Sequence, residues 1–190
     1  MTLHVGVLAL QGDFAAHERA VAALGHRVRQ VKTAAPLDSL DALLLPGGES
    51  TTMLKFLQGE ELLEPVAAFC RSGRPVFGTC AGAILLANEV TSPEQASLDV
   101  MDMAVERNAY GRQVDSFIAR IEDAVPALRG VEAVFIRAPR IRRVGPGVEV
   151  LMRHEGEPIL VRQGAVYAAT FHPEMTDDSR VLAAVLAGGA

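Results

Sequence analysis

The amino-acid sequence predicts an α/β fold: a three-layer sandwich with a mostly parallel central sheet, a nucleophile elbow and antiparallel additions. Three observations lead to this prediction. Strand-like and helix-like segments alternate through the first half of the 190 residues, which is the order expected of parallel strands joined by helices. The strand-like segments are continuous apolar runs, as in sheets that are covered on both faces. Short strand-like runs separated by Gly and Pro fill the second half, and they favour antiparallel pairing there.

The elements of the first half follow from apolar runs and from the turn residues that flank them. Asp13 and Gly25 are placed to cap and to end the first helix, and Ser50 is placed to cap the second. Pro46 and two glycines stop the third strand. The predicted strands are residues 5–10, 28–31, 42–45 and 75–77, and the predicted helices are residues 13–24, 51–57, 62–70 and 83–87.

The second half is predicted to add strands to the parallel core. Glu155, Gly156 and Glu157 suit a hairpin turn, and a helix over residues 178–186 precedes a Gly-rich tail. No repeat or low-complexity linker interrupts the sequence, so a single domain is predicted over residues 1–190. The predicted strands of this half are residues 112–121, 133–137, 148–153, 159–161 and 165–171.

The composition limits the classes of protein to which this chain can belong. Hydrophobic residues make up 49% of the chain and charged residues 22%, as in globular proteins. The net charge of −5 gives no electrostatic support for binding nucleic acid. Two cysteines are too few for a disulfide framework, and neither a leader segment nor an apolar stretch of about 20 residues is present. We therefore expect a soluble, cytoplasmic protein with reduced thiols.

The most informative motif is a cysteine in a G-x-C-x-G frame, formed by Gly78, Cys80 and Gly82. An apolar run precedes it and a helix-like run follows, which is the strand–turn–helix context of a nucleophile elbow. The sharp turn strains the backbone at its centre, so the flanking residues must be small. The N–H groups at the start of the following helix favour a thiolate. The alternative is a buried structural cysteine, as we expect for Cys70, which continues an apolar helical stripe.

A thiolate nucleophile usually works with a general base and a carboxylate that orients the base. His172 and Glu174 follow an apolar strand, and Pro173 between them favours extended backbone, in which residues two apart project to the same side. They can therefore act together, although a polar loop before the last helix explains them equally well. His17 is expected to form only a weak surface pair with Asp13, four residues earlier on the predicted helix. The other histidines are expected to be solvated or structurally bonded, namely His4, His26 and His154.

A second turn, Pro-Gly-Gly-Glu-Ser at residues 46–50, joins a buried strand to a helix. Backbone N–H groups of such a turn can bind an anion or a carboxylate, although a tight turn with a helix cap would use the same residues. Neither a Walker motif nor a dinucleotide-binding motif is present, and no His–Cys cluster has the spacing of zinc ligands. This turn, Gln11-Gly12 and Cys80 all follow predicted parallel strands, so we expect them to meet at one edge of the sheet.

Together these motifs resemble those of class I, triad-type glutamine amidotransferases. Four segments make the resemblance specific to the glutaminase subunits of pyridoxal 5′-phosphate synthase: residues 10–12, 46–53, 105–117 and 134–139. The resemblance extends from about residue 5 to residue 186. Ile118 departs from it, because an acidic residue is expected after the Val-Asp-Ser-Phe segment, but Ile118 touches no motif residue.

The resemblance implies a set of site residues. Cys80 would be the nucleophile, and His172 and Glu174 would complete a catalytic triad. Backbone N–H groups of Gly48 and Ala81 would form the oxyanion hole. The glutamine site would be lined by Gly48, Glu49, Ser50, Arg107, Ile136 and Arg137.

The same resemblance implies a substrate and a partner. L-Glutamine would be hydrolysed to L-glutamate and ammonia, and a separate synthase subunit would use the ammonia to make pyridoxal 5′-phosphate, so that the two chains form a hetero-oligomer. Gln11 lies where the family couples the active site to this partner. Pyridoxal phosphate is then a product, and no cofactor, metal, nucleic acid or membrane is expected.

Two alternatives stand beside this interpretation. One is another cysteine hydrolase on the same scaffold, a peptidase or a γ-glutamyl hydrolase, against which Arg107-Asn108 and the run at residues 135–139 argue. The other is a non-catalytic regulatory or binding module, against which an intact cysteine, histidine and glutamate argue. Three further arginines are expected to be solvated or to face the partner, namely Arg140, Arg142 and Arg143.

Overall fold

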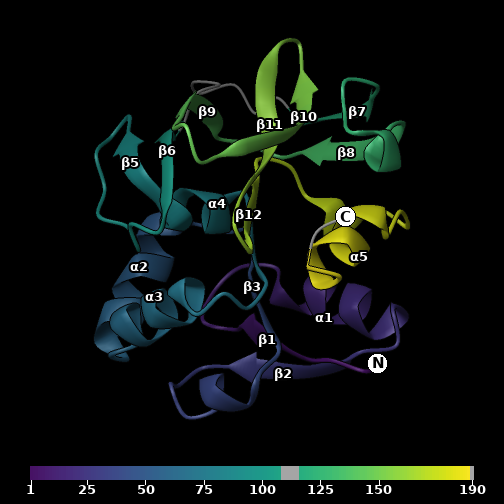
Figure 1. Cartoon of the computed structure of the whole chain (residues 1–190). Helices are drawn as coiled ribbons and strands as arrows, with labels where there is room; N and C mark the ends of the chain where they lie inside the picture. The colour runs from purple at the N-terminus through teal and green to yellow at the C-terminus, as the bar shows by residue number, and fades with distance from the viewer. Residues whose placement is uncertain (108–115, 189–190) are drawn as a thin grey trace.

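The computed structural model describes residues 1–107 and 116–188 and shows helices on both faces of a central sheet (Figure 1). The strands of this sheet are β1 (His4–Leu8), β2 (Arg27–Val31), β3 (Ala42–Leu45), β4 (Val76–Thr79), β10 (Glu149–His154), β11 (Glu157–Gln163) and β12 (Val166–Ala169). Their order is β10-β11-β12-β4-β3-β1-β2. The five strands from β12 to β2 run parallel, whereas β10 and β11 pair antiparallel. The predicted α/β fold with a mostly parallel sheet is therefore confirmed.

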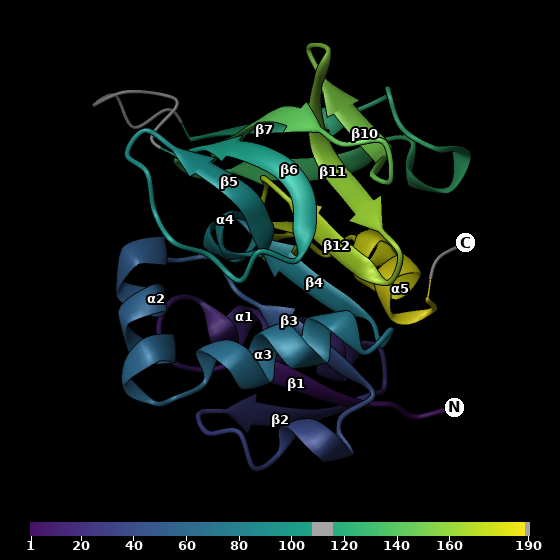
Figure 2. The ribbon, with the colours of Figure 1, turned by 60° about the vertical axis from the view of Figure 1, so that its left-hand side comes forward.

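The helices divide between the two faces of the sheet, as Figures 1 and 2 show. One face is covered by α1 (Phe14–Ala23) and α5 (Arg180–Leu186), and the other by α2 (Ser50–Gly59), α3 (Leu63–Arg71) and α4 (Ala81–Leu86). Alternate residues of β3 join different cores: Leu43 and Leu45 pack with α2, α3 and α4, while Ala42 and Leu44 pack with α1 and α5. This burial on both faces explains why continuous apolar runs mark the parallel strands. None of the helices in the described part of the chain is long and apolar enough to cross a membrane.

The second half of the chain adds two small sheets. One contains β5 (Ala87–Thr91), β6 (Met101–Glu106) and β9 (Arg140–Val144), and the other contains β7 (Phe117–Ile121) and β8 (Val131–Phe135). β10 and β11 are joined by a two-residue turn at Glu155 and Gly156, which have φ of 51° and 83°. Positive φ at both positions is the conformation that suits a tight hairpin. The predicted hairpin is confirmed.

Not every strand of the second half pairs antiparallel, which corrects the prediction. β12 pairs in parallel with β4, with Val166 opposite Val76, and β5 pairs in parallel with β6. β12 is buried throughout because it lies between β4 and β11, inside the sheet rather than at its edge. The strand predicted at residues 112–121 corresponds to β7 from Phe117 onward, and residues 112–115 lie outside the described residues.

The cap of α2 also differs from the prediction. The helix begins at Ser50, and its cap is Glu49, whose carboxylate accepts the N–H groups of Thr51 (3.3 Å) and Thr52 (2.7 Å). The longer side chain of glutamate reaches these free donors of the first turn. The hydroxyl of Ser50 points elsewhere and donates to Gln95. The ends of the other predicted helices differ from the observed ends by about two residues or less.

Candidate active site

The strand–turn–helix predicted around Cys80 is present in the structure. β4 ends at Thr79, Cys80 adopts φ 49° and ψ −103°, and α4 starts at the next residue. A positive φ is strained for a cysteine and holds its side chain at the tip of the turn. The turn packs this closely because residue 82 is a glycine: a Cβ on Gly82 would collide with the carbonyl oxygen of Leu45 on β3. Backbone packing against the neighbouring strand therefore fixes the elbow.

The Cys80 side chain is buried at the carboxyl ends of the parallel strands, where the residue is 7% exposed. Its N–H donates to the carbonyl of Ala169 on β12 (2.8 Å), and its Sγ lies 4.0 Å from the carbonyl oxygen of Ile136. The other cysteine, Cys70, lies on the buried face of α3 and packs in the core, and burial raises its pKa to about 12. Cys70 is therefore an inert core thiol, as predicted.

His172 and Glu174 lie just beyond β12 and bond to each other. Nδ1 of His172 is 2.7 Å from Oε1 of Glu174. Because a carboxylate can only accept, Nδ1 carries the proton of this bond, and Nε2 of the neutral ring keeps a lone pair. Nε2 is buried and has no partner in hydrogen-bond geometry among the described residues. His172 thus presents the ring atom that a general base needs.

Burial and charge shift the pKa values of this pair in opposite directions. Burial lowers the pKa of His172, but the nearby Cys80 and the hydrogen bond and charge of Glu174 outweigh it and raise the pKa to about 10. Burial raises the pKa of Glu174, but the charge of His17 and hydrogen bonds from His17 and His172 outweigh it and bring the pKa to about 2. A cationic His172 beside an anionic Glu174 is therefore favoured at neutral pH.

The prediction that His17 forms a weak surface pair with Asp13 is wrong. His17 is only 1% exposed, and its Nε2 lies 3.0 Å from Oγ1 of Thr79 and 3.3 Å from Oε1 of Glu174. Asp13 caps α1 instead. A signal was present in the sequence, because His17 stands four residues before Val21 and therefore on the buried face of α1. Glu174 is thus shared by two histidines, of which sequence reasoning found one.

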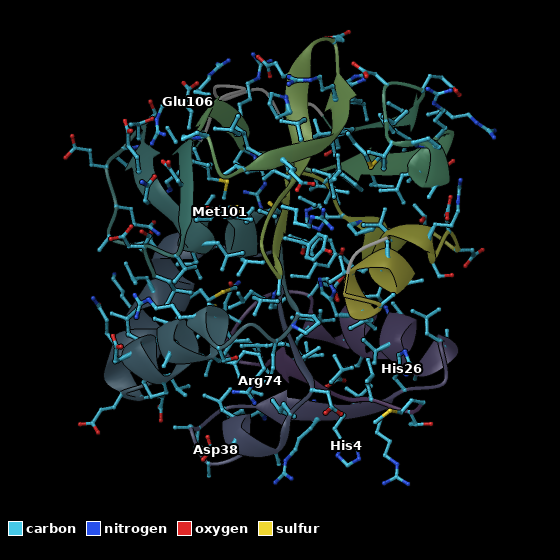
Figure 3. All side chains as sticks on the ribbon, viewed as in Figure 1. His4, His26, Asp38, Arg74, Met101 and Glu106 are labelled. Carbon is cyan, nitrogen blue, oxygen red and sulfur yellow. The ribbon has the colours of Figure 1, made fainter. Side chains whose placement is uncertain are left out.

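The remaining histidines lie elsewhere in the molecule. His4 opens β1 and His26 directly precedes β2, so both lie at the opposite end of the parallel strands (Figure 3). The ring of His154 packs on Phe117 and Phe135, with centroid distances of 5.7 and 5.6 Å. These positions agree with the structural roles expected for them.

The Pro-Gly-Gly-Glu turn after β3 contacts the catalytic candidates. A Cβ on Gly47 would collide with the ring of His172 and lie 3.4 Å from Cβ of Cys80, so a glycine permits this approach. The loop after β1 holds the turn from another side, because Oε1 of Gln11 accepts the N–H of Glu49 at 2.9 Å. The three strand ends that were expected to meet at one edge of the sheet do meet there.

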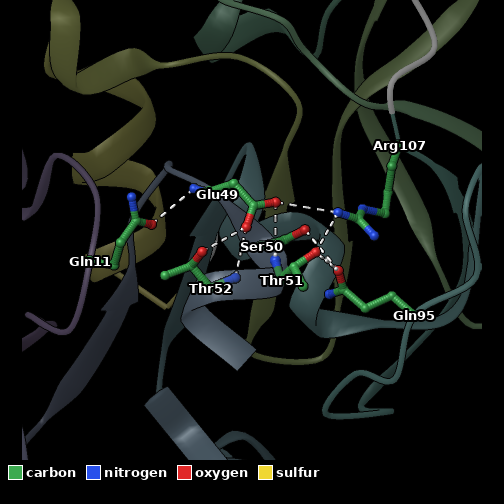
Figure 4. Close-up of polar contacts among 7 residues, drawn as sticks. All are labelled: Gln11, Glu49, Ser50, Thr51, Thr52, Gln95 and Arg107. Atoms are coloured by element: carbon green, nitrogen blue, oxygen red, sulfur yellow. Dashed lines mark hydrogen bonds and ion pairs between the residues drawn. The ribbon is translucent and has the colours of Figure 1, made fainter. Parts of the chain in front are cut away.

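A polar network links this turn to Arg107 (Figure 4). Arg107 is 8% exposed, and its Nη2 donates to Oγ1 of Thr51 (2.8 Å) and lies 3.4 Å from Oε1 of Glu49. The hydroxyls of Ser50 and Thr51 donate to Oε1 of Gln95. Burial raises the pKa of Glu49, but the donors at the start of α2 and the charge of Arg107 outweigh it and lower the pKa. Sequence reasoning found Glu49, Ser50 and Arg107, but it missed Thr51 and Gln95, whose local sequence carries no chemical signal.

Glu49, Ser50 and Arg107 of this network line a cavity of about 270 Å³, together with Cys80 and His172. Sites for drug-sized ligands measure roughly 300–1,000 Å³, so this cavity suits a smaller ligand, of the size of an amino acid. Gln11 and Glu174 do not line the cavity themselves. They bond to Glu49 and to His172, which do. The predicted residues in the wall are Gly48, Glu49, Ser50, Cys80, Arg107, Ile136, Arg137 and His172, and they are joined by Asp13, Gly47, Ile84, Pro139 and Met175.

The wall of the cavity combines the thiol of Cys80 and the imidazole of His172 with acidic and basic side chains, among them Glu49 and Arg107. Within residues 1–107 and 116–188, no group of three or more His, Cys, Asp and Glu side chains could hold a metal ion. Glu49 and Arg107 have the charges to bind an ammonium and a carboxylate, and a thiol beside an imidazole is the pair that attacks a carbonyl carbon with proton transfer. The geometry therefore suits acyl transfer from an amino-acid substrate.

Comparisons with known proteins point to the same chemistry. The model of the SNO glutamine amidotransferase family matches residues 7–186. The pyridoxal 5′-phosphate synthase subunit PdxT of Solibacter usitatus is 53% identical over 182 residues, which cover 93% of this chain and 94% of the relative. The protein of the same name from Thermotoga neapolitana is 48% identical over 179 residues, which cover 94% of this chain and 95% of the relative.

Solved structures show the same fold. A crystal structure of a glutamine amidotransferase matches with a TM-score of 0.90 at 49% identity and covers 96% of this chain and 97% of that chain. The structure of PurLQS from Thermotoga maritima matches with a TM-score of 0.72 and covers 98% of this chain and 99% of that chain. Its identity is 16%, so this second likeness shows the fold alone.

Proposed function

The chain belongs to the SNO glutamine amidotransferase family, and we propose that it is the glutaminase subunit of a pyridoxal 5′-phosphate synthase. In this role it hydrolyses L-glutamine to L-glutamate and ammonia. The observation that carries the proposal is the cavity in which Cys80 and His172 stand beside the oppositely charged Glu49 and Arg107. Such a site can hold the α-carbon end of glutamine while a nucleophile attacks the side-chain amide.

The charged residues suit the two ionic groups of the substrate. The Glu49 carboxylate pairs with the α-ammonium group, and the Arg107 guanidinium pairs with the α-carboxylate. Ser50, Ile136 and Arg137 complete the wall around the substrate. Bound in this way, glutamine extends its side-chain amide toward the elbow.

The triad then performs acyl transfer in two steps. The thiolate of Cys80 attacks the amide carbon, and the N–H groups of Gly48 and Ala81 hold the oxyanion, with about 3 kcal/mol from each donor. His172 gives a proton to the leaving ammonia, and it then takes a proton from the water that hydrolyses the γ-glutamyl thioester. Glu174 orients the imidazole and stabilises its cationic form.

The relatives of this chain are named as subunits of pyridoxal 5′-phosphate synthase, so we propose a synthase subunit as its partner. The partner receives the ammonia, and pyridoxal 5′-phosphate is the product of the assembly. We propose that Gln11 couples docking to catalysis, and its hydrogen bond with the backbone of Glu49, in the turn beside Cys80, supports this role. A cytoplasmic location is part of the same proposal.

An ammonia assay with glutamine, with and without the cognate synthase, tests the proposal. We expect the wild-type chain to release ammonia, faster with the synthase, and Cys80→Ala to release only background amounts while still binding the synthase. Cys70→Ala is the matched control, since Cys70 is buried in the core, and it should keep its activity. Undiminished release by Cys80→Ala would refute the assigned nucleophile, and cleavage of γ-glutamyl peptides without glutaminase activity would favour a peptidase.

A further inference from the structure

Gln95 has no part in the reaction described above, yet it bonds to the turn that holds the substrate. It lies in the loop between β5 and β6 and outside the wall of the cavity. Its Oε1 accepts hydrogen bonds from Oγ of Ser50 at 3.0 Å and from Oγ1 of Thr51 at 3.2 Å (Figure 4). Both hydroxyls belong to the first turn of α2. One carbonyl oxygen therefore binds two neighbouring groups of the proposed glutamine site.

The bond to Thr51 determines how that hydroxyl meets Arg107. A hydroxyl has one hydrogen, and Thr51 donates it to Gln95. The lone pairs of Oγ1 are then free to accept from Nη2 of Arg107, at 2.8 Å. The network thus has a direction: Gln95 orients the hydroxyl, and the hydroxyl orients the guanidinium that is proposed to bind the substrate carboxylate.

The loop that carries Gln95 is anchored on the helix of the elbow. The N–H of Leu98 donates to the carbonyl of Leu85 at 2.8 Å, and Oγ of Ser97 donates to the carbonyl of Ala87 at 2.6 Å. These two carbonyls lie at the end of α4, the helix that begins directly after the nucleophile. Gln95 therefore connects the element that carries the nucleophile with the turn that carries the substrate.

Both hydrogen bonds of the Gln95 side chain with α2 are made by its oxygen, Oε1. The amide nitrogen Nε2 is buried and has no hydrogen-bond partner within the described residues. An unpaired buried donor is unfavourable, so the favourable contribution of the side chain comes from Oε1. A carboxylate at this position would keep both acceptor contacts, whereas a thioether of similar size would lose them.

We propose that Gln95 is a positioning residue of the glutamine site: through the hydroxyls of Ser50 and Thr51 it orients Arg107 and sets the place of the substrate relative to the elbow. The inference rests on the proposed glutaminase function. Gln95 touches neither the substrate nor the reacting atoms. Its loss should therefore weaken substrate binding more than it slows the chemical step.

Steady-state ammonia release in complex with the cognate synthase tests this role. Gln95→Met should raise the KM for glutamine about tenfold and leave kcat within about twofold. Gln95→Glu, which keeps the acceptor, should bring KM back to within about threefold of the wild-type value. Adding Gln95→Met to Thr51→Val should raise KM no further than Thr51→Val alone, because both changes interrupt the same chain of bonds.

The outcomes separate this role from a purely structural one. An unchanged KM in Gln95→Met, an equal rise in Gln95→Glu, or a loss confined to kcat would each overturn the proposal. Thermal melting shows whether each variant folds, and Gln95→Ala, with the same expected rise in KM, replaces Gln95→Met if the latter does not fold. A wild-type complex that releases no ammonia from glutamine would overturn the proposed function itself, and the role of Gln95 with it.

Discussion

The elbow at Cys80 and the turn at Glu49 have the same local architecture, but different forces hold them. Each follows a buried parallel strand, β4 or β3, and each leads into a helix. The elbow is held by packing: Gly82 lies against the backbone of β3, and the Cys80 side chain makes no cap to α4. The turn also packs closely at Gly47, but polar side chains add to that packing, because Glu49 caps α2 while Gln11 and Arg107 bond to it.

This difference predicts how the elbow and the turn should respond to substitutions. Protein interiors are close-packed and yield little, so an added atom at the elbow must displace backbone. The turn is held by several hydrogen bonds from separate segments, and each contributes only a modest net free energy. We therefore expect all-or-none effects at the elbow and graded effects at the turn.

The largest effect is expected from Gly82→Ala. The added Cβ would collide with the carbonyl oxygen of Leu45, so α4 or β3 must move. The free energy of unfolding should fall by about 3 kcal/mol or more, with loss of glutaminase activity. Urea unfolding measures the change. Gly59→Ala, where no atom lies within 4 Å of the new Cβ, is the control and should shift stability by less than about 1 kcal/mol. Overlapping unfolding curves for the two variants would contradict the packing account.

A smaller and pH-dependent effect is expected from Glu174→Gln, which changes the hydrogen-bond partner of His172. The pKa of Glu174 is about 2 in the folded chain against an ordinary 4.5, so its stabilising charge is present above pH 4.5 and is lost as the pH falls toward 2. The pKa of His172 is about 10 against an ordinary 6.5, so its contribution is present below pH 6.5 and is lost as the pH rises toward 10. The wild type should exceed the variant most, by about 2 kcal/mol, between these two limits.

Urea midpoints of both chains, measured from about pH 3 to about pH 9, check this window. Glu64→Gln is the control, because its ion pair with Arg71 leaves the glutamate side chain 81% exposed, and it should change stability little at any pH. A stability difference that does not vary with pH would show that His172 and Glu174 are not an ion pair in the folded chain.

The smallest effect is expected from Glu49→Gln, in the turn. The amide keeps an acceptor for the first N–H groups of α2 but loses the charge that the helix start favours, at a cost of about 0.5–1 kcal/mol in the free energy of unfolding. Glu60→Gln, at the other end of the same helix, makes the same change of charge without a cap and should be neutral or slightly stabilising. A loss at Glu49 as large as that of Gly82→Ala would remove the distinction between the two turns.

Prediction from the sequence succeeded where one local signal sufficed. β1, β3 and β4 are continuous apolar runs that glycine-containing turns follow, so their burial and their parallel pairing could be predicted. β12 was predicted as a strand, but its parallel pairing with β4 was not, because nothing in Val166–Ala169 says that its second partner is β4 rather than another hairpin strand. Three strands were not predicted at all, since short half-buried runs lack a clear period: β5, β6 and β9.

The residues of the candidate site likewise divide into those that a local sequence signal identifies and those that it does not. Cys80 stands in a glycine frame and Glu49 follows a double glycine, so each could be found from its neighbours in the chain. His17 and Gln95 could not be assigned their contacts, because their partners lie far along the sequence at Glu174 and at the start of α2. Gln11 was found because it belongs to a recognised motif after a buried strand, whereas Gln95 lies in a loop without a motif.

The sequence alone determined the fold class, the elbow and the types of residue available for catalysis, because strand and helix periods, turn glycines and helix ends are local properties of the chain. Only the tertiary structure decided which of these residues touch. It brought a second histidine to Glu174 and joined Gln95 to the proposed glutamine site. The physical reason is that burial and hydrogen bonding between distant segments depend on how the layers pack, and no short stretch of sequence records that packing.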